Sequence, residues 1–137
     1  MNEQTTKNWI LKAESDLKIG RYGLTMEKPA TDAICFHAQQ CAEKYLKAFL
    51  IFHGKEIKKT HDIALLIEDC SETDPDFRNL YEINADKLTE YAVELRYSVT
   101  DLDDLFPPIE ETQEAIAIAE KVKDFVLRKL KDEGFEM

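Results

Sequence analysis

Residues 29–54 constrain the fold of this chain most strongly, because their apolar side chains recur at helical spacing over about half of a helix circumference. This apolar face comprises Cys35, Ala38, Cys41, Ala42, Tyr45, Leu46, Ala48, Phe49, Leu50 and Phe52. A surface helix carries a narrower apolar face, so we expect a central helix with neighbours on two or three sides. The narrow polar stripe that remains either opens to solvent or faces a bound molecule. It consists of Asp32, His37, Gln40, Glu43, Lys44 and Lys47.

Four further segments have helical periodicity, and no segment alternates as a β-strand does. They are residues 5–24, 60–70, 77–97 and 108–131. Thr5 or Thr6 is expected to cap the first of these helices and Thr60 to cap the second, while Gly54 ends the central helix. Gly20, on the apolar stripe of the first helix, predicts a close helix–helix contact. We therefore predict an all-α fold, an up-and-down bundle of about four to five helices, with residues 1–137 forming a single domain.

The composition supports a helical protein without membrane contact. Gly and Pro are few, and charged residues make up 34% of the 137 residues. No apolar run reaches the ~20 residues that span a bilayer, and residues 1–25 lack the pattern of a secretory signal. A cytoplasmic location is therefore expected. Cys35, Cys41 and Cys70 have no CxxC spacing and are expected to be buried, reduced thiols.

Charge is distributed unevenly along the chain. The formal net charge is −10, yet residues 28–59 carry six lysines against three acids, and residues 62–114 carry sixteen acids against three bases. A negative overall field opposes non-specific nucleic-acid binding, so a nucleotide or RNA contact must use a local basic feature. The candidates are Lys44, Lys47, Lys55, Lys58 and Lys59. Alternatively, the basic segment packs beside the acidic half and neutralises it.

Common catalytic and cofactor motifs are absent from the sequence. It contains no phosphate-binding loop, no dinucleotide fingerprint and no HExxH motif. His37, His53 and His61 have no partner at metal-ligand spacing, so neither a metal nor another cofactor is expected. A nucleophilic pair of His37 with Cys35 or Cys41 would lack a third, orienting group.

One set of polar residues is a candidate binding site. It comprises Gln40, Lys44, Lys47, His61, Arg96 and Tyr97. Lysine and arginine bind phosphate, glutamine reads a base edge and tyrosine stacks on a ring. Each residue also has a simpler structural explanation. Lys47 forms an i,i+4 pair with Glu43 on a solvated stripe, Arg96 pairs with a nearby acid, and His61 helps to cap a helix.

Three stretches resemble HEPN domains (higher eukaryotes and prokaryotes nucleotide-binding domains). Residues 39–44, read as QQCAEK and followed by Lys47 and Ala48, resemble the second-helix signature of that family. Residues 60–63, read as THDI, resemble the start of its next helix, and the Arg96–Tyr97 pair resembles the end of its later long helix. Trp9, Ala13 and Asp16 fit its first helix, so the resemblance covers nearly the whole chain.

This resemblance implies a helical bundle, usually a homodimer. It also implies a nucleotide- or substrate-binding partner of a minimal nucleotidyltransferase, as in a toxin–antitoxin-type system. Other members are metal-independent ribonucleases in which a histidine follows the arginine by about four to six residues. In this sequence no histidine follows Arg96, and Ser98 stands where proline is common.

We therefore carry three hypotheses forward. The leading one is a non-catalytic module that binds a nucleotide or a nucleotidyltransferase's substrate. The second is a metal-independent ribonuclease in which Arg96 stabilises the reacting phosphate and His61, or His37, supplies the acid or base. The third is a scaffold or self-association domain without a ligand.

Overall fold

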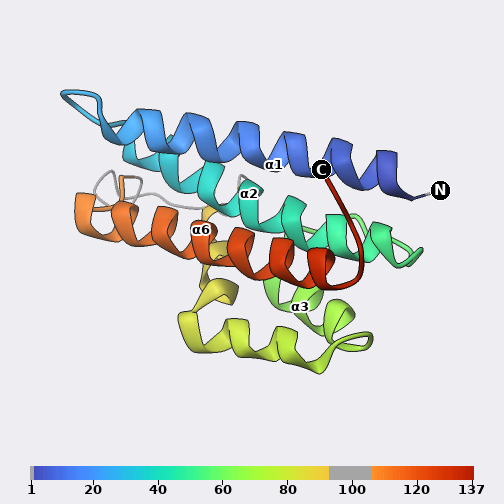
Figure 1. Ribbon diagram of the computed structural model, residues 1–137. Coiled ribbons are helices and arrows are strands. Elements are labelled where there is room, and N and C mark those ends of the chain that lie inside the picture. Colours follow the sequence, from blue (N-terminus) through green and yellow to red (C-terminus); the bar gives the residue numbers. More distant parts are fainter. Residues whose placement is uncertain (1, 93–105) are drawn as a thin grey trace.

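The computed structural model describes residues 2–92 and 106–137. Three long helices, α1 (Glu3–Leu24), α2 (Thr31–Phe52) and α6 (Ile109–Asp132), lie side by side (Figure 1). The short helix α3 (Ile63–Ser71) and the 3₁₀-helices η1 (Pro75–Ile83) and η2 (Ala85–Tyr91) pack beside α2 and α6. Every regular element of the described residues is helical, which confirms the all-α prediction. α6 runs parallel to α2, as the second and fourth members of an up-and-down bundle do.

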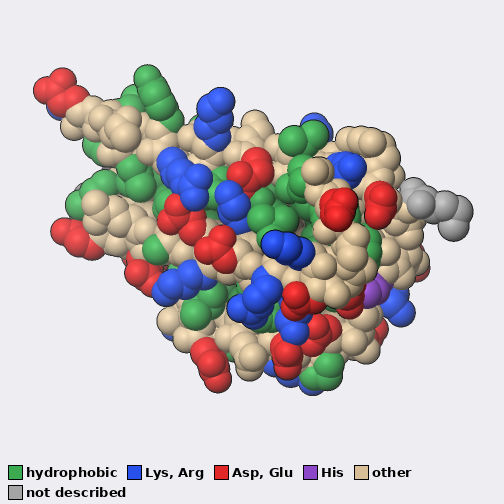
Figure 2. Space-filling model, viewed as in Figure 1, with side chains coloured by type: hydrophobic (Ala, Val, Ile, Leu, Met, Phe, Trp, Pro, Cys, Tyr) green, Lys and Arg blue, Asp and Glu red, His purple; other side chains and the backbone are tan. Residues whose placement is uncertain are grey.

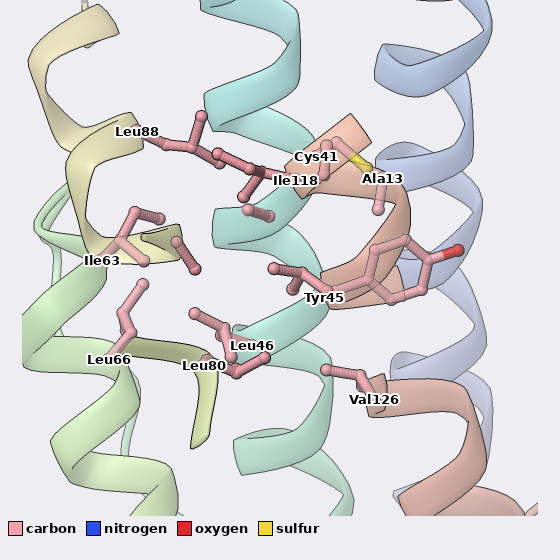
Figure 3. Close-up of a cluster of buried hydrophobic side chains, with 14 of the residues drawn as sticks. Ala13, Cys41, Tyr45, Leu46, Ile63, Leu66, Leu80, Leu88, Ile118 and Val126 are labelled. Atoms are coloured by element: carbon pink, nitrogen blue, oxygen red, sulfur yellow. The ribbon is translucent and has the colours of Figure 1, made fainter. Parts of the chain in front are cut away.

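α2 is the central helix, as its wide apolar face predicts. Its side chains Cys41, Tyr45 and Leu46 lie among side chains from α1, α3, α6 and both 3₁₀-helices (Figure 3). Tyr45, Leu46 and Phe49 are fully buried. The ring of Phe49 stacks 4.3 Å from that of Phe77 in η1. The wide apolar face of α2 therefore packs against neighbouring elements on several sides of the helix.

α1 approaches its neighbours closely at its two glycines. A Cβ placed on Gly20 would lie 2.6 Å from Cδ1 of Ile116 in α6, and one on Gly23 would lie 2.7 Å from Cγ1 of Ile34 in α2. Real Cβ atoms do not approach other atoms so closely, so a larger residue at either position would force the facing isoleucine side chain to shift. The close contact predicted from Gly20 is confirmed.

Residues 77–91 differ from the single helix predicted over 77–97. η1 and η2 are separate 3₁₀-helices, and Asn84 between them adopts φ 62°, in the left-handed region. Asparagine tolerates this conformation better than most residues. The buried residues Phe77 and Leu80, and then Ala85 and Leu88, recur every three residues, the period of a 3₁₀-helix. Residues 93–97, the end of the predicted helix, lie outside the described residues.

The helix ends differ in part from their predicted caps. α1 begins after Asn2, and the Thr6 hydroxyl lies inside the helix, where it donates to the Asn2 carbonyl at 2.7 Å. Asp62 rather than Thr60 caps α3, because its carboxylate accepts from Leu65 N at 3.3 Å. Gly54 lies just past α2 at φ +68°, as a helix-terminating glycine does. These differences concern only the residues that cap the helices, and they leave the order of the helices along the chain unchanged.

Charged side chains of both signs interleave over α1 and α6 (Figure 2). Arg21 of α1 pairs with Glu120 of α6 at 2.5 Å, and Lys123 of α6 pairs with Glu14 of α1 at 2.9 Å. The hydroxyl of Tyr45 in α2 also donates to Glu14. These contacts join all three long helices along one edge. Within the described residues, no helix has both the length and the apolar character required to cross a bilayer.

Candidate functional site

Glu43 of α2 is the centre of a buried polar cluster. Its side chain is only 5% exposed and binds Lys47 Nζ at 2.9 Å through Oε2. Through Oε1 it contacts Gln39 Nε2 at 3.0 Å and His61 Nδ1 at 2.8 Å. Burial alone would raise the pKa of Glu43, but the hydrogen bonds from Lys47, His61 and Gln39 outweigh burial and hold the pKa below its ordinary value. An ionised carboxylate can only accept hydrogen bonds, so Nδ1 of His61 carries the proton in its hydrogen bond to Glu43.

Lys47 is held from two sides. Its side chain is 8% exposed, and its ammonium lies 5.8 Å from the centre of the Trp9 ring in α1. An ammonium beside an aromatic face is stabilised by the electron density of the ring. The predicted i,i+4 pair with Glu43 is therefore present, although it is buried and the stripe here is not solvated.

Asp16 of α1 is the centre of a second, similar cluster. Its Oδ2 accepts from Lys44 Nζ at 2.5 Å, and its Oδ1 contacts His37 Nδ1 at 2.8 Å. Both partners lie on α2, so the carboxylate joins the two helices. In the sequence, Asp16 lies at the border of the apolar face of α1, and the structure buries it there.

Two glutamines extend the Glu43 cluster along α2. Gln40 Nε2 donates to Gln39 Oε1 at 2.7 Å, and Gln39 Nε2 donates to the His61 carbonyl at 3.2 Å as well as to Glu43. Together with the Asp16 cluster, whose α2 partners are His37 and Lys44, they form a row of polar groups from α1 across α2 to the segment before α3. We call it the polar seam; it comprises Asp16, His37, Gln39, Gln40, Glu43, Lys44, Lys47 and His61.

The structure brings four of the six predicted site residues together. Gln40, Lys44, Lys47 and His61 all belong to the polar seam, and their binding roles stay predictions. Arg96 and Tyr97 lie outside the described residues. His61 contributes its backbone carbonyl and its ring to the seam, and the following residue, Asp62, caps α3.

Three residues that organise the seam, Gln39, Glu43 and Asp16, were not predicted from the sequence as site residues. Gln39 and Glu43 are buried, and Glu43 binds three partners. A signal was present, because Gln39, Glu43 and Lys47 follow one another at steps of four and lie on nearly one helix azimuth. The connection of Asp16 to Lys44 spans 28 residues, and no local pattern indicates it.

The other candidate groups do not form a catalytic centre. Cys35, Cys41 and Cys70 are buried and unbridged, as expected, and burial raises the pKa of Cys35 to about 11. A buried thiol of this kind is a poor nucleophile.

Lys58 pairs with Asp69 at 3.2 Å, which agrees with a basic segment that packs against the acidic half. Among residues 2–92 and 106–137, no three His, Cys, Asp or Glu side chains are grouped to hold a metal ion.

Three surface hollows lie away from the polar seam. One is at the C-terminal segment around Phe135, one lies between η2 and α6 beside Tyr91, and one lies between η1 and α6 beside Phe125. None of these three hollows is lined by a seam residue. The buried charged side chains, and not any of these three hollows, therefore mark the seam as a candidate site.

Comparison with known proteins identifies the family of this chain. A model of the HEPN domain family matches residues 6–130. The chain therefore belongs to the HEPN domain family.

Two solved structures agree with this assignment. TT1696 from Thermus thermophilus has 29% identity and a TM-score of 0.75, with 95% of this chain and 100% of that chain covered. ST0689, an archaeal HEPN homologue, has 27% identity and a TM-score of 0.71, with 91% of this chain and 97% of that chain covered. A search of curated proteins gives no match.

Proposed function

We propose that this chain is a non-catalytic binding module that holds a nucleotide, or the substrate of a partner enzyme, against the polar seam. The observation that carries the proposal is that two largely buried carboxylates gather two lysines and one histidine of α2 and a second histidine, His61, from the segment before α3. Burying charged groups costs free energy unless they are paired, and an ordinary solvated helix face needs no such arrangement. Fixed ammonium and imidazole groups suit the recognition of phosphate, and the Gln40 amide suits a base edge.

Calorimetry with a panel of nucleotides tests this proposal, with the chain alone and with a candidate nucleotidyltransferase. We expect binding that weakens several-fold in Lys44→Gln, because Lys44 is the more exposed of the two seam lysines. Lys12→Gln, a substitution on the exposed face of α1, is the matched control and should bind as the wild type does. Silence with every nucleotide, with and without the partner enzyme, rejects the proposal.

The proposal includes a homodimer that works beside a minimal nucleotidyltransferase in a toxin–antitoxin-type system in the cytoplasm. Its support is membership of the HEPN family together with the resemblance of residues 39–48 to the family's second-helix signature. Light scattering of the purified chain, with and without the enzyme encoded beside it, measures both associations. A chain that stays monomeric and does not bind the enzyme at micromolar concentration contradicts this part of the proposal.

A ribonuclease is the second candidate, and the Glu43–His61 pair favours it. Glu43 holds Nδ1 of His61, which assigns the other ring nitrogen, Nε2, as the proton acceptor. This is the orientation that a general base requires. RNA cleavage should then fall at least about tenfold in His61→Gln and in Arg96→Ala, whereas His53→Gln should leave it unchanged. Cleavage that survives Arg96→Ala and His61→Gln excludes these roles.

A scaffold without a ligand is the third candidate. Each seam lysine already has a carboxylate partner, which agrees with a purely structural network. Under this hypothesis the calorimetric panel stays silent while the dimer or the complex with the enzyme still forms. The two measurements above therefore separate the scaffold from the binding module.

A further inference from the structure

Each carboxylate of the polar seam is shared by one lysine and one histidine. Asp16 binds Lys44 and His37, and Glu43 binds Lys47 and His61. The two carboxylates offset the two ammonium groups, so the formal charge of these paired groups is zero while both imidazoles are neutral. It becomes positive only when a histidine is protonated. The histidines therefore control whether the seam attracts an anion.

The histidines are also the more accessible partners. The side chains of His37 and His61 are 28% and 46% exposed, whereas Asp16 and Glu43 lie largely beneath the surface. An anion that arrives from solvent meets the imidazoles before it can reach Lys47. A neutral imidazole offers the anion no net charge, whereas an imidazolium adds a charge-assisted hydrogen-bond donor.

We propose that the polar seam takes up a phosphate-bearing anion together with protons, which bind to His37 and His61. The inference rests on the proposed binding function and adds its regulation, namely tighter binding at lower pH. Histidine is the side chain whose charge ordinarily changes between about pH 5 and pH 8, and the pH dependence is sought in that range.

The charges around His37 come from three helices. α1 supplies Asp16 as its direct partner, and α2 supplies Lys44 on the other oxygen of that carboxylate. Two further charges of α1, Glu14 and Arg21, are paired with Lys123 and Glu120 of α6. α6 therefore pairs with these two charges, and the ion-pair partner of His37 is Asp16, which Lys44 shares.

The described residues place charges of α2 and of the start of α3 around His61. Glu43 is its direct partner, and Lys47 lies on the other oxygen of that carboxylate. Asp62 follows His61 in the chain, and its carboxylate caps α3. From η2, Thr89 contributes a neutral hydroxyl that accepts from Ile63 N at 2.9 Å.

The test needs a ligand whose own charge is constant with pH. A deoxydinucleoside monophosphate of adenine meets this requirement, because its single phosphodiester stays ionised across the range. Calorimetry between about pH 6 and pH 8 should show its Kd rising at least about tenfold as both imidazoles lose their charge. Repeating the titration in two buffers of different ionisation enthalpy should show proton uptake, a readout that needs no variant.

Two substitutions assign the protons. His37→Gln and His61→Gln should each reduce the pH dependence and the proton uptake, and the double variant should abolish both. His53→Gln is the matched control, because His53 lies outside the seam and pairs with Glu133 after α6. Far-UV circular dichroism at each pH verifies that the helices persist.

The outcomes separate this inference from the proposed function. Silence of the dinucleotide and of the whole nucleotide panel at every pH rejects the binding function and the inference with it. Binding with a constant Kd and no proton uptake rejects only the inference. A pH dependence that survives in the double histidine variant likewise overturns it.

Discussion

Gly20 of α1 faces Ile116 of α6 so closely that a Cβ would stand 2.6 Å from Cδ1, so the end of the isoleucine side chain must move to admit one methyl group. Gly20→Ala should therefore destabilise the chain by about 1–3 kcal/mol, despite the higher helix propensity of alanine. Ile116→Val removes the clashing atom. Urea denaturation of a double-mutant cycle should show that the cost of Gly20→Ala is smaller in the Ile116→Val background. Equal costs in both backgrounds would disprove the contact.

Glu43→Gln should destabilise the fold by about 3 kcal/mol, because it leaves the largely buried ammonium of Lys47 without its counterion. The double variant Glu43→Gln/Lys47→Met should recover much of this loss, since it removes the unpaired charge. Glu72→Gln, at an exposed position after α3, is the control and should change the free energy of unfolding by less than about 0.5 kcal/mol. A Glu43→Gln variant as stable as this control would mean that the pair is open to water.

Acid should weaken the fold through the same residue. The pKa of Glu43 is lowered from its ordinary value of 4.5, as is that of Glu14. A carboxylate with a lowered folded-state pKa stabilises fully above the unfolded value, and this stabilisation disappears as the pH falls through the folded pKa. The free energy of unfolding should therefore decline below about pH 4.5, and less steeply in Glu43→Gln. Equal slopes in the variant and the wild type would contradict the assignment.

Asn84 should tolerate glycine better than alanine. Its φ of 62° lies in the left-handed region, where a Cβ costs about 1–2 kcal/mol and glycine is unstrained. We expect Asn84→Ala to lower the denaturation midpoint and Asn84→Gly to leave it nearly unchanged. If alanine were the more stable variant, residues 75–91 would form one continuous helix.

The three cysteines should resist thiol reagents in the folded chain. All are buried, and burial raises the pKa of Cys35 to about 11, so its thiolate is scarce at pH 8. A chromogenic disulfide should react with none of them in native buffer and with all three in guanidinium. Rapid reaction of one thiol under native conditions would show that its surroundings open.

The bundle could be predicted from the sequence because local periodicity encodes it. Residues 31–52 show the wide apolar face of a central helix, and Gly20 and Gly54 mark a close contact and a helix end. The break at Asn84 was missed because an apolar row at steps of three and four suits an α-helix or a pair of 3₁₀-helices equally well. Only the packing of Phe77 and Leu80 decides between these alternatives.

The candidate site was predicted only in part, for a related reason. Lys44 and Lys47 stand out as cations on a polar stripe, so spacing alone brings them together. Their counterions come from different parts of the chain. Glu43, the partner of Lys47, is a near neighbour on the same helix, whereas Asp16, the partner of Lys44, lies on another helix. On a helical wheel, polar residues are taken to be solvated, and the burial of Glu43 and Lys47 was therefore missed.

Glu43 pairs both with the buried Lys47 and with His61, and this double pairing has an evolutionary consequence. Losing this carboxylate would leave the ammonium of Lys47 unpaired inside the bundle, so the requirement to fold is by itself a reason to keep Glu43 and Lys47. A descendant can abandon its ancestral ligand and still display an unchanged second helix. Functional divergence among such proteins is therefore better sought at the half-exposed His61, which lies outside that helix.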